Sequence, residues 1–318
     1  MHFNNHKRSH LLPWPAAFLL LAAIWGCSFW WMKLGLEMLA PVQVAFVRLA
    51  VGAMALVVLS VVTRARLPRN LSTWRHIFVV AVLMNSVPFT LFAVGETHVS
   101  SVLAGIINAA TPLTTLAVIL LAFPEEQPNL ERVAGLMVGF VGILIVVGVW
   151  EGLGSGEWTG VLACVGAVSC YGVAIPYIRR HLTGVPESGI GLATAQVSLG
   201  AVLLLPIAIA AGPLPGPIAL NPVLAMLGLG ALGSGIAFAL NYQVIGAAGP
   251  STASMVTYLT PLFAIVVGMA FLGESVTWNE PAGGLVVLLG VAVAQGRVGS
   301  AAALLRRRLW SSVEIAPD

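Results

Sequence analysis

The feature that most constrains this chain is a succession of apolar runs, each close to the length needed to cross a lipid bilayer. A membrane-spanning helix requires about 20 predominantly apolar residues, and ten such runs follow one another with brief connectors. The composition agrees, because 8% of the residues are charged and 58% are hydrophobic, whereas a soluble domain carries about 25% charged residues. We therefore expect an all-α integral membrane protein with ten transmembrane helices. The expected spans are Trp14–Met32, Val42–Val62, Ile77–Gly95, Val99–Phe123, Val133–Trp150, Thr159–Ile178, Ile190–Ala211, Val223–Ile245, Ser251–Gly273 and Pro281–Gly296.

Lysine and arginine residues predict how these helices are oriented, because cytoplasmic loops of membrane proteins carry an excess of both. With ten helices, 13 of the 15 basic residues fall on one side of the bilayer, and only Lys33 and Arg48 remain. Both termini are therefore expected in the cytoplasm. Residues 1–13 would form a cytoplasmic N-terminal segment, and residues 297–318 a basic cytoplasmic tail. The first apolar run is interpreted as a membrane helix and not as a removable signal peptide.

Two stretches of the chain resemble each other at a constant offset of 149 residues. Ser101–Thr115 and Pro250–Ala264 both contain Thr-Pro-Leu and a stripe of small and polar residues on one helical face. Each half of the chain would hold five helices, an odd number, so the second half is inserted upside down. We expect residues 14–150 and 151–296 to form two inverted five-helix repeats, an architecture that supports alternating access.

Several of these motifs resemble those of a known family. They are Trp25-Gly26-Cys27-Ser28-Phe29 in the first expected helix, and Thr-Pro-Leu followed by a short acidic link, at Glu125 in one half and Glu274 in the other. Together with the five-plus-five arrangement, they resemble the drug/metabolite transporter superfamily in its EamA-domain branch, and within it the YddG-type amino-acid exporters. The resemblance covers about residues 14–296. It implies a monomeric bundle in a bacterial inner membrane, with the third, fourth, eighth and ninth helices around a central cavity.

Polar and aromatic residues inside the expected helices are candidates for the solute-binding cavity. A polar side chain within the membrane is costly unless it has a partner, and an amide among aromatic rings suits a zwitterionic, partly apolar solute. The alternative is structural, with the same side chains making interhelical hydrogen bonds and packing contacts. The candidate substrate-binding residues are Trp25, Asn85, Phe89, Asn108, Tyr171, Phe238, Asn241, Tyr242, Thr257 and Tyr258.

Two Thr-Pro pairs, Thr111-Pro112 and Thr260-Pro261, are candidate hinges. Proline within a helix removes one backbone hydrogen bond and frees a carbonyl group, which a threonine hydroxyl can satisfy. Such a kink either serves helix packing alone or also lets one end of the bundle open and close.

Three charged or titratable residues lie within or at the ends of the expected helices, and their surroundings have to be interpreted one by one. Arg48 is the only basic residue well inside an expected helix, where it either has a functional role or extends its side chain outward to the membrane surface. The sequence leaves both possibilities open. Glu96 and His98 lie at an expected helix boundary on the external side, and we interpret them as a solvated pair.

The sequence contains no catalytic constellation, cofactor motif or metal-ligand cluster, so neither an enzyme nor a cofactor is expected. The net charge of +3 gives no indication of a nucleic-acid partner. Because no carboxylate lies near the middle of an expected helix, a proton relay is disfavoured. We expect a uniporter that exports small metabolites, with aromatic or large apolar amino acids preferred. The main alternative is an exporter of another neutral metabolite or drug, and in that alternative coupling to protons stays open.

Overall fold

A computed structural model describes residues 12–122, 130–150, 155–182, 185, 187–248 and 256–294. Within these residues all regular structure is helical, as expected. Seven helices are long and apolar enough to cross a membrane, and three shorter apolar helices accompany them. Four features expected from the sequence lie outside the described residues: the segment before residue 12, the basic tail 297–318, the acidic link at Glu125, and residues 251–255 at the start of the ninth span.

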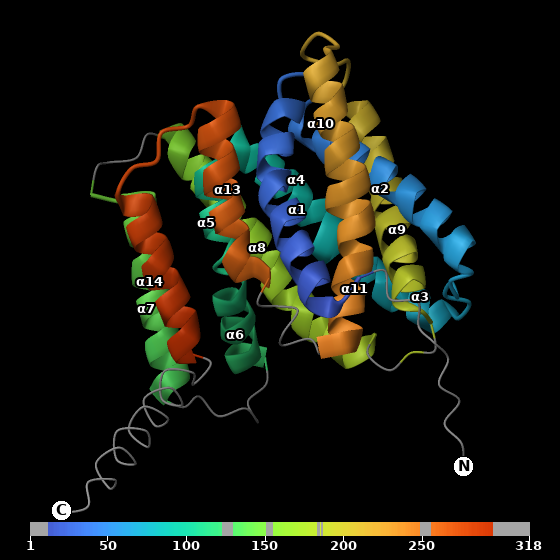
Figure 1. The fold of residues 1–318 in the computed structure, drawn as a ribbon, viewed down its shortest axis with the longest axis horizontal. Coiled ribbons are helices and arrows are strands. Elements are labelled where there is room, and N and C mark those ends of the chain that lie inside the picture. Colours follow the sequence, from blue (N-terminus) through green and yellow to red (C-terminus); the bar gives the residue numbers. More distant parts are fainter. Residues whose placement is uncertain are drawn as a thin grey trace, which may run out of the picture.

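The described helices form two consecutive sets (Figure 1). The first set is α1 (Trp14–Gly35), α2 (Pro41–Thr63), α3 (Leu71–Val80), η1 (Ala81–Ser86), α4 (Val87–Glu96), α5 (Ser101–Asn108), α6 (Thr111–Ala122) and α7 (Leu130–Val147). The second set is α8 (Ser155–His181), α9 (Gly189–Ala210), α10 (Leu220–Gly230), η2 (Ala231–Ile236), α11 (Ala237–Ala248), α13 (Val256–Leu272) and α14 (Asn279–Ala294).

One long helix in each set passes through a π-helical segment of six residues, η1 in one and η2 in the other. The wider π turn is rare and is found mostly where function requires a local change in the helix. Pro88 is the second residue after η1 and has no N–H to donate, whereas η2 contains Gly233 and Gly235. At Asn85 and Ser86 the helix therefore changes type without ending, and the span Leu71–Glu96 stays helical throughout.

The two Thr-Pro motifs have different local structures. In the first set the expected span is divided into α5 and α6, and Thr111 Oγ1 donates a hydrogen bond of 2.7 Å to the Asn108 carbonyl. In the second set α13 continues through Pro261, and Thr260 Oγ1 donates to the Val256 carbonyl at 3.1 Å. In both motifs the threonine hydroxyl bonds to a carbonyl of the preceding turn, so the difference lies in the backbone.

The contacts between the helices are reciprocal between the two sets. Helix α2 packs against η2 and α9 against η1, while α2 and α9 also pack against each other. Helix α1 contacts α10, α11 and α13, and α8 likewise contacts α4, η1 and α6. Helices α7 and α14 form a closely packed pair at one side of the molecule (Figure 1). The buried clusters at the centre draw residues from α1, α2, α4, α8, α9 and α11.

Candidate functional site

A stripe of buried side chains runs along the inner face of the η1–α4 helix. Asn85, Phe89, Phe92 and Glu96 recur at helical spacing and therefore share one face, and each is at most 4% exposed. Val87, on another face, is 38% exposed. The inner face of this span thus presents an amide, two aromatic rings and a carboxyl group in succession.

Arg48 of α2 lies against this stripe. Its side chain is 6% exposed, so it points into the bundle rather than toward the membrane surface. The guanidinium carbon lies 3.6 Å from the centroid of the Phe89 ring, in cation–π geometry. Arg48 Nε donates a hydrogen bond of 3.0 Å to Ser234 Oγ in η2. The sequence left open whether this side chain stays inside the bundle or extends outward to the membrane surface, and its burial supports the first possibility.

Aromatic rings surround the Arg48–Phe89 pair. Phe89 and Phe238 belong to one buried cluster, and Tyr171 and Tyr242 pack against it. Trp25 of α1 meets Phe238 edge to face, with the ring centroids 6.3 Å apart. Five of the ten candidate binding residues therefore come together around Arg48.

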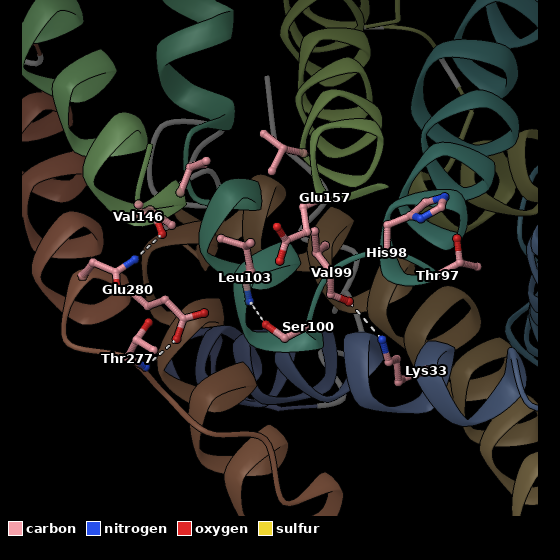
Figure 2. Close-up of a pocket in the computed structure, with 14 residues that line it drawn as sticks. Lys33, Thr97, His98, Val99, Ser100, Leu103, Val146, Glu157, Thr277 and Glu280 are labelled. Atoms are coloured by element: carbon pink, nitrogen blue, oxygen red, sulfur yellow. Dashed lines mark hydrogen bonds between the residues drawn. The ribbon is translucent and has the colours of Figure 1, made fainter. Parts of the chain in front are cut away.

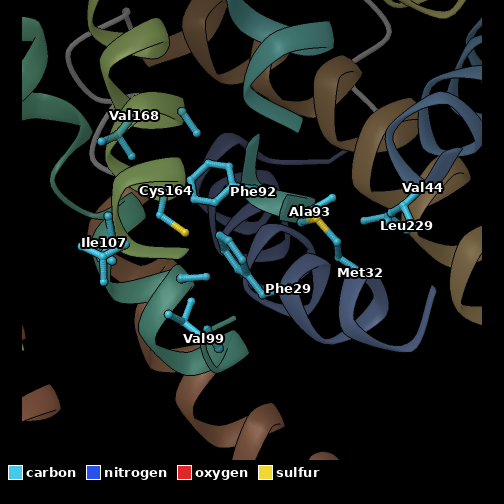
Figure 3. Close-up of a cluster of buried hydrophobic side chains, with 14 of the residues drawn as sticks. Phe29, Met32, Val44, Phe92, Ala93, Val99, Ile107, Cys164, Val168 and Leu229 are labelled. Atoms are coloured by element: carbon cyan, nitrogen blue, oxygen red, sulfur yellow. The ribbon is translucent and has the colours of Figure 1, made fainter. Parts of the chain in front are cut away.

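A neighbouring cluster continues this interior toward the end of α4. Phe92 meets Phe29 edge to face with 5.5 Å between the ring centroids, beside Cys164 and Val168 of α8 (Figure 3). Tyr171 packs against this cluster as well, with its ring centroid 6.1 Å from that of Phe92. Cys164 is completely buried in apolar surroundings, as expected of a cysteine that serves packing.

Asn85 has a partner that the sequence analysis did not identify. Gln196 of α9 is 2% exposed, and its Nε2 donates to Asn85 Oδ1 at 2.6 Å. Asn85 Nδ2 is buried and has no hydrogen-bond partner among the residues that the structure describes. One end of this amide is therefore bonded to α9, while its donor end is unsatisfied.

Three other candidate residues lie elsewhere. Tyr258 packs against the cluster of Ala110, Leu113, Val287 and Val291, between α6 and α14. Asn108 is half-buried at the end of α5, where its backbone carbonyl accepts the Thr111 hydrogen bond. Thr257 is half-buried on α13. None of the three belongs to the aromatic cluster around Phe89, so their assignment to solute binding stays a prediction. Asn241 is half-buried on α11, next to Tyr242.

Charged groups gather where α4 ends and α5 begins. The interpretation of Glu96 and His98 as a solvated pair is wrong for Glu96, which is completely buried. Neither of its carboxylate oxygens has a hydrogen-bond partner in the described part of the chain. Lys33 Nζ donates instead to the backbone carbonyls of Glu96, at 2.6 Å, and Val99, at 2.9 Å. The position of Glu96 at a helix end was predicted correctly, whereas the direction of its side chain was not.

Next to this site is a pocket of about 490 Å³. Charged and polar side chains line it, including Lys33, His98, Glu157 and Glu280 (Figure 2). His98, unlike Glu96, is exposed here. The pocket lies at the end of the bundle, beyond the aromatic interior. Its lining combines Lys33 and His98 with the acidic residues Glu157 and Glu280.

Glu274 joins the second set of helices to the first at the same end. Its carboxylate accepts hydrogen bonds from Ser101 N at 2.8 Å, Ser101 Oγ at 2.8 Å and Val102 N at 3.1 Å. The N–H groups at the start of a helix lack partners within the helix, and the helix dipole favours a negative charge there. The acidic link that follows α13 thus caps α5.

The helices and this buried interior define a class, a multi-pass membrane protein with a polar and aromatic centre. Comparison with known families identifies the class more closely, because the EamA-like transporter family matches residues 12–148 and again residues 158–295. The chain belongs to the EamA-like transporter family. The resemblance to the EamA branch of the drug/metabolite transporter superfamily is confirmed, and this membership assigns the chain to transport and not to catalysis.

Similar proteins match along most of their length. The chain is 27% identical to the uncharacterized transporter YdfC of Bacillus subtilis, over 86% of this chain and 87% of that protein. It is also 27% identical to the uncharacterized inner membrane transporter YedA of Escherichia coli, over 90% of this chain and 92% of that one. A crystal structure with 18% sequence identity superposes with a TM-score of 0.62 and covers 88% of this chain and 98% of its own. That likeness supports the fold alone.

Proposed function

We propose that this transporter exports amino acids, with aromatic or large apolar side chains preferred, as the YddG-type members do. The observation that supports this most is the meeting of Arg48 and Asn85, two buried polar side chains, with the rings of Phe89 and Phe238. Buried donors suit the polar end of an amino acid, and the rings suit an apolar side chain. Solute would bind at the centre, between the two halves of the chain.

The proposed mechanism is alternating access by two inverted repeats of five helices each. Support comes from the two successive family matches, from the reciprocal helix contacts, and from the π segment that each half contains. Because each half could adopt the arrangement of the other, the bundle would open to either side in turn. The Thr111-Pro112 and Thr260-Pro261 motifs are proposed as the hinges.

The proposed setting is the bacterial inner membrane, with both termini in the cytoplasm and the protein acting as a monomer. The distribution of Lys and Arg supports this orientation. The similarity to YedA, which is described as an inner membrane transporter, supports the location.

Counterflow in liposomes tests the substrate. Purified protein would be reconstituted into liposomes loaded with unlabelled phenylalanine, leucine, glutamate or uridine, with the labelled compound outside and no pH gradient. We expect labelled phenylalanine to accumulate transiently, and leucine more weakly. Phe89→Ala should reduce this flux about tenfold or more, by removing the ring beneath Arg48. The control Leu262→Ala, at an exposed leucine of α13, should leave it unchanged. Exchange of uridine but of no amino acid would contradict the proposal.

A second candidate, proton-coupled export of another neutral metabolite, is favoured by Glu96. A completely buried carboxyl group without hydrogen-bond partners among the described residues is suited to bind and release a proton in each transport cycle. Under this alternative, flux would require an imposed pH gradient, and Glu96→Gln would abolish that requirement. Uniport predicts instead that a solute gradient alone drives flux in both the wild type and Glu96→Gln.

A further inference from the structure

We infer that Arg48 is the residue that binds the carboxylate of the transported solute, an inference that rests on the proposed amino-acid transport. Arg48 is buried, and its direct contacts among the described residues are the hydrogen bond to Ser234 Oγ and the ring of Phe89. Neither of these contacts carries a negative charge, and Glu96 acts on Arg48 electrostatically without a hydrogen bond or ion pair between them in the described part of the chain. A cation within the membrane interior is costly unless an anion or several acceptors compensate it.

Most N–H donors of Arg48 have no acceptor among the described residues, and their arrangement indicates which kind of ligand would fit. A guanidinium group has five N–H donors, and the bond to Ser234 uses the one on Nε. The ring of Phe89 stabilises the cation from its face but accepts nothing from the in-plane N–H groups. The four donors on the two terminal nitrogens therefore remain for a ligand. Their planar fork matches the two oxygens of a carboxylate.

The described carboxyl groups do not fill this position. Glu96 follows Phe89 by seven residues on the same helix face, which places the two about 10 Å apart along the axis. Glu96 and Arg48 attract each other electrostatically, but no ion pair joins Arg48 to an acidic residue in the described part of the chain. The position in front of its terminal nitrogens is therefore open to an anion from outside the protein.

The second unsatisfied group nearby is also a donor. Asn85 precedes Phe89 by one helical turn, and its Nδ2 is buried without a partner among the described residues. Gln196 holds the opposite end of this amide, which leaves the donor end directed away from Gln196. Two groups with unfilled donors, one in contact with the Phe89 ring and the other one helical turn before Phe89, are complementary to an acceptor-rich, anionic ligand and not to a second cation.

Ser234 and Phe89 give the guanidinium a fixed orientation. Ser234 belongs to η2 in the second half of the chain, whereas Phe89 belongs to α4 in the first. Arg48 therefore contacts both π-containing helices at once. A carboxylate bound to its terminal nitrogens would lie at the boundary between the halves, with Phe238 and Trp25 close enough to receive an apolar side chain.

The test compares phenylalanine with phenylalaninamide, which keeps the ring and the ammonium group but has no carboxylate. Both would be measured by counterflow in liposomes for the wild type, Arg48→Gln, Arg48→Lys and the control Arg179→Gln, at an exposed arginine of α8. We expect the wild type and Arg179→Gln to prefer phenylalanine by about 10- to 100-fold, as a charge-assisted bidentate pair would give. Arg48→Gln should lose this preference by slowing phenylalanine and not the amide, and Arg48→Lys should lie between.

Ser234→Ala provides a test that does not depend on removing the charge. It frees the guanidinium from its anchor and should raise the KM for phenylalanine severalfold while the preference over the amide persists. An unchanged preference in folded Arg48→Gln, or an unchanged KM in folded Ser234→Ala, would overturn the assignment of Arg48 while leaving amino-acid transport intact. No phenylalanine flux in the wild type would overturn the proposed function and this inference together.

Discussion

The same contact between a helix and a π segment occurs twice in this protein, and only one copy carries a charge. On α2, Arg48 bonds to Ser234 of η2, and Gly52 lies one turn further along. On α9, Gln196 bonds to Asn85 of η1 and also precedes a glycine, Gly200, by one turn. Each contact joins one half of the chain to the other.

The difference between the two copies distinguishes the features that pack the two halves together from the feature that can recognise a ligand. What they share is a polar side chain and a glycine at i+4, which lets the helices approach closely. What differs is charge. The Gln196–Asn85 pair links two neutral amides over 2.6 Å, whereas Arg48 keeps most of its donors unused. The polar side chain and its glycine hold the halves together in both copies. The unused donors of Arg48 occur in one copy only, and they are where a ligand can be recognised.

The largest expected loss of stability comes from substituting Gly52, the glycine beside the Arg48–Ser234 contact. A Cβ at Gly52 would lie 2.7 Å from Ser234 Cβ and 3.0 Å from the Gly230 carbonyl oxygen. Gly52→Val should therefore cost about 3 kcal/mol of stability, because the backbone of η2 must move. Thermal unfolding in detergent, followed by tryptophan fluorescence, measures the loss.

The matched change on the neutral side should be milder. At Gly200 the nearest atom to an added Cβ is Leu49 Cδ1, 3.1 Å away at the end of a flexible side chain. Gly200→Ala should cost about 1 kcal/mol or less, and less than Gly52→Ala. Equal losses for the two alanine variants would mean that the copies are packed alike, contrary to the geometry.

An intermediate effect is expected from breaking the amide pair. Gln196→Ala leaves both ends of the buried Asn85 amide without partners, which should cost about 1–3 kcal/mol. Replacing both residues removes the unsatisfied group as well, so Asn85→Ala with Gln196→Ala should cost less than the sum of the single changes. Chemical unfolding of the four proteins of this cycle gives the coupling energy. Strict additivity would show that the bond contributes nothing.

The smallest expected effect on stability is that of Arg48→Gln, which makes the two copies chemically alike. Losing the bond to Ser234 is offset by removing a buried cation that makes no ion pair with a carboxylate among the described residues. The melting temperature should change by only a few degrees, corresponding to about 1 kcal/mol or less. A loss as large as that of Gln196→Ala would indicate that Arg48 is a structural residue with satisfied partners.

The fold was predictable from the sequence because apolar runs of bilayer length leave few alternatives to helices. The aromatic interior was predictable in part, since Phe89 and Phe238 occupy matching positions in a repeated pattern. The family followed from motifs at fixed spacing, and its match to both halves confirms it.

The polar partners were harder to predict. The direction of Arg48 depends on which face of α2 is buried, and one signal was present, because Gly52 lies one turn along the same face, as small residues do in helix contacts. Gln196 has no charge to attract attention, although Gly200 follows it at the same spacing. The burial of Glu96 depends on how the connection to α5 turns, and no local pattern encodes that.

The central claim is that solute binds between the two π-containing helices. A photoreactive phenylalanine analogue, irradiated with the protein in liposomes and mapped by mass spectrometry, tests it most directly. We predict adducts on Val87–Glu96 and Ala237–Ala248 that excess phenylalanine suppresses, and that Arg48→Gln reduces but Arg179→Gln does not. Adducts confined to lipid-facing positions such as Val58 or Leu262, or adducts that phenylalanine does not suppress, would contradict the account.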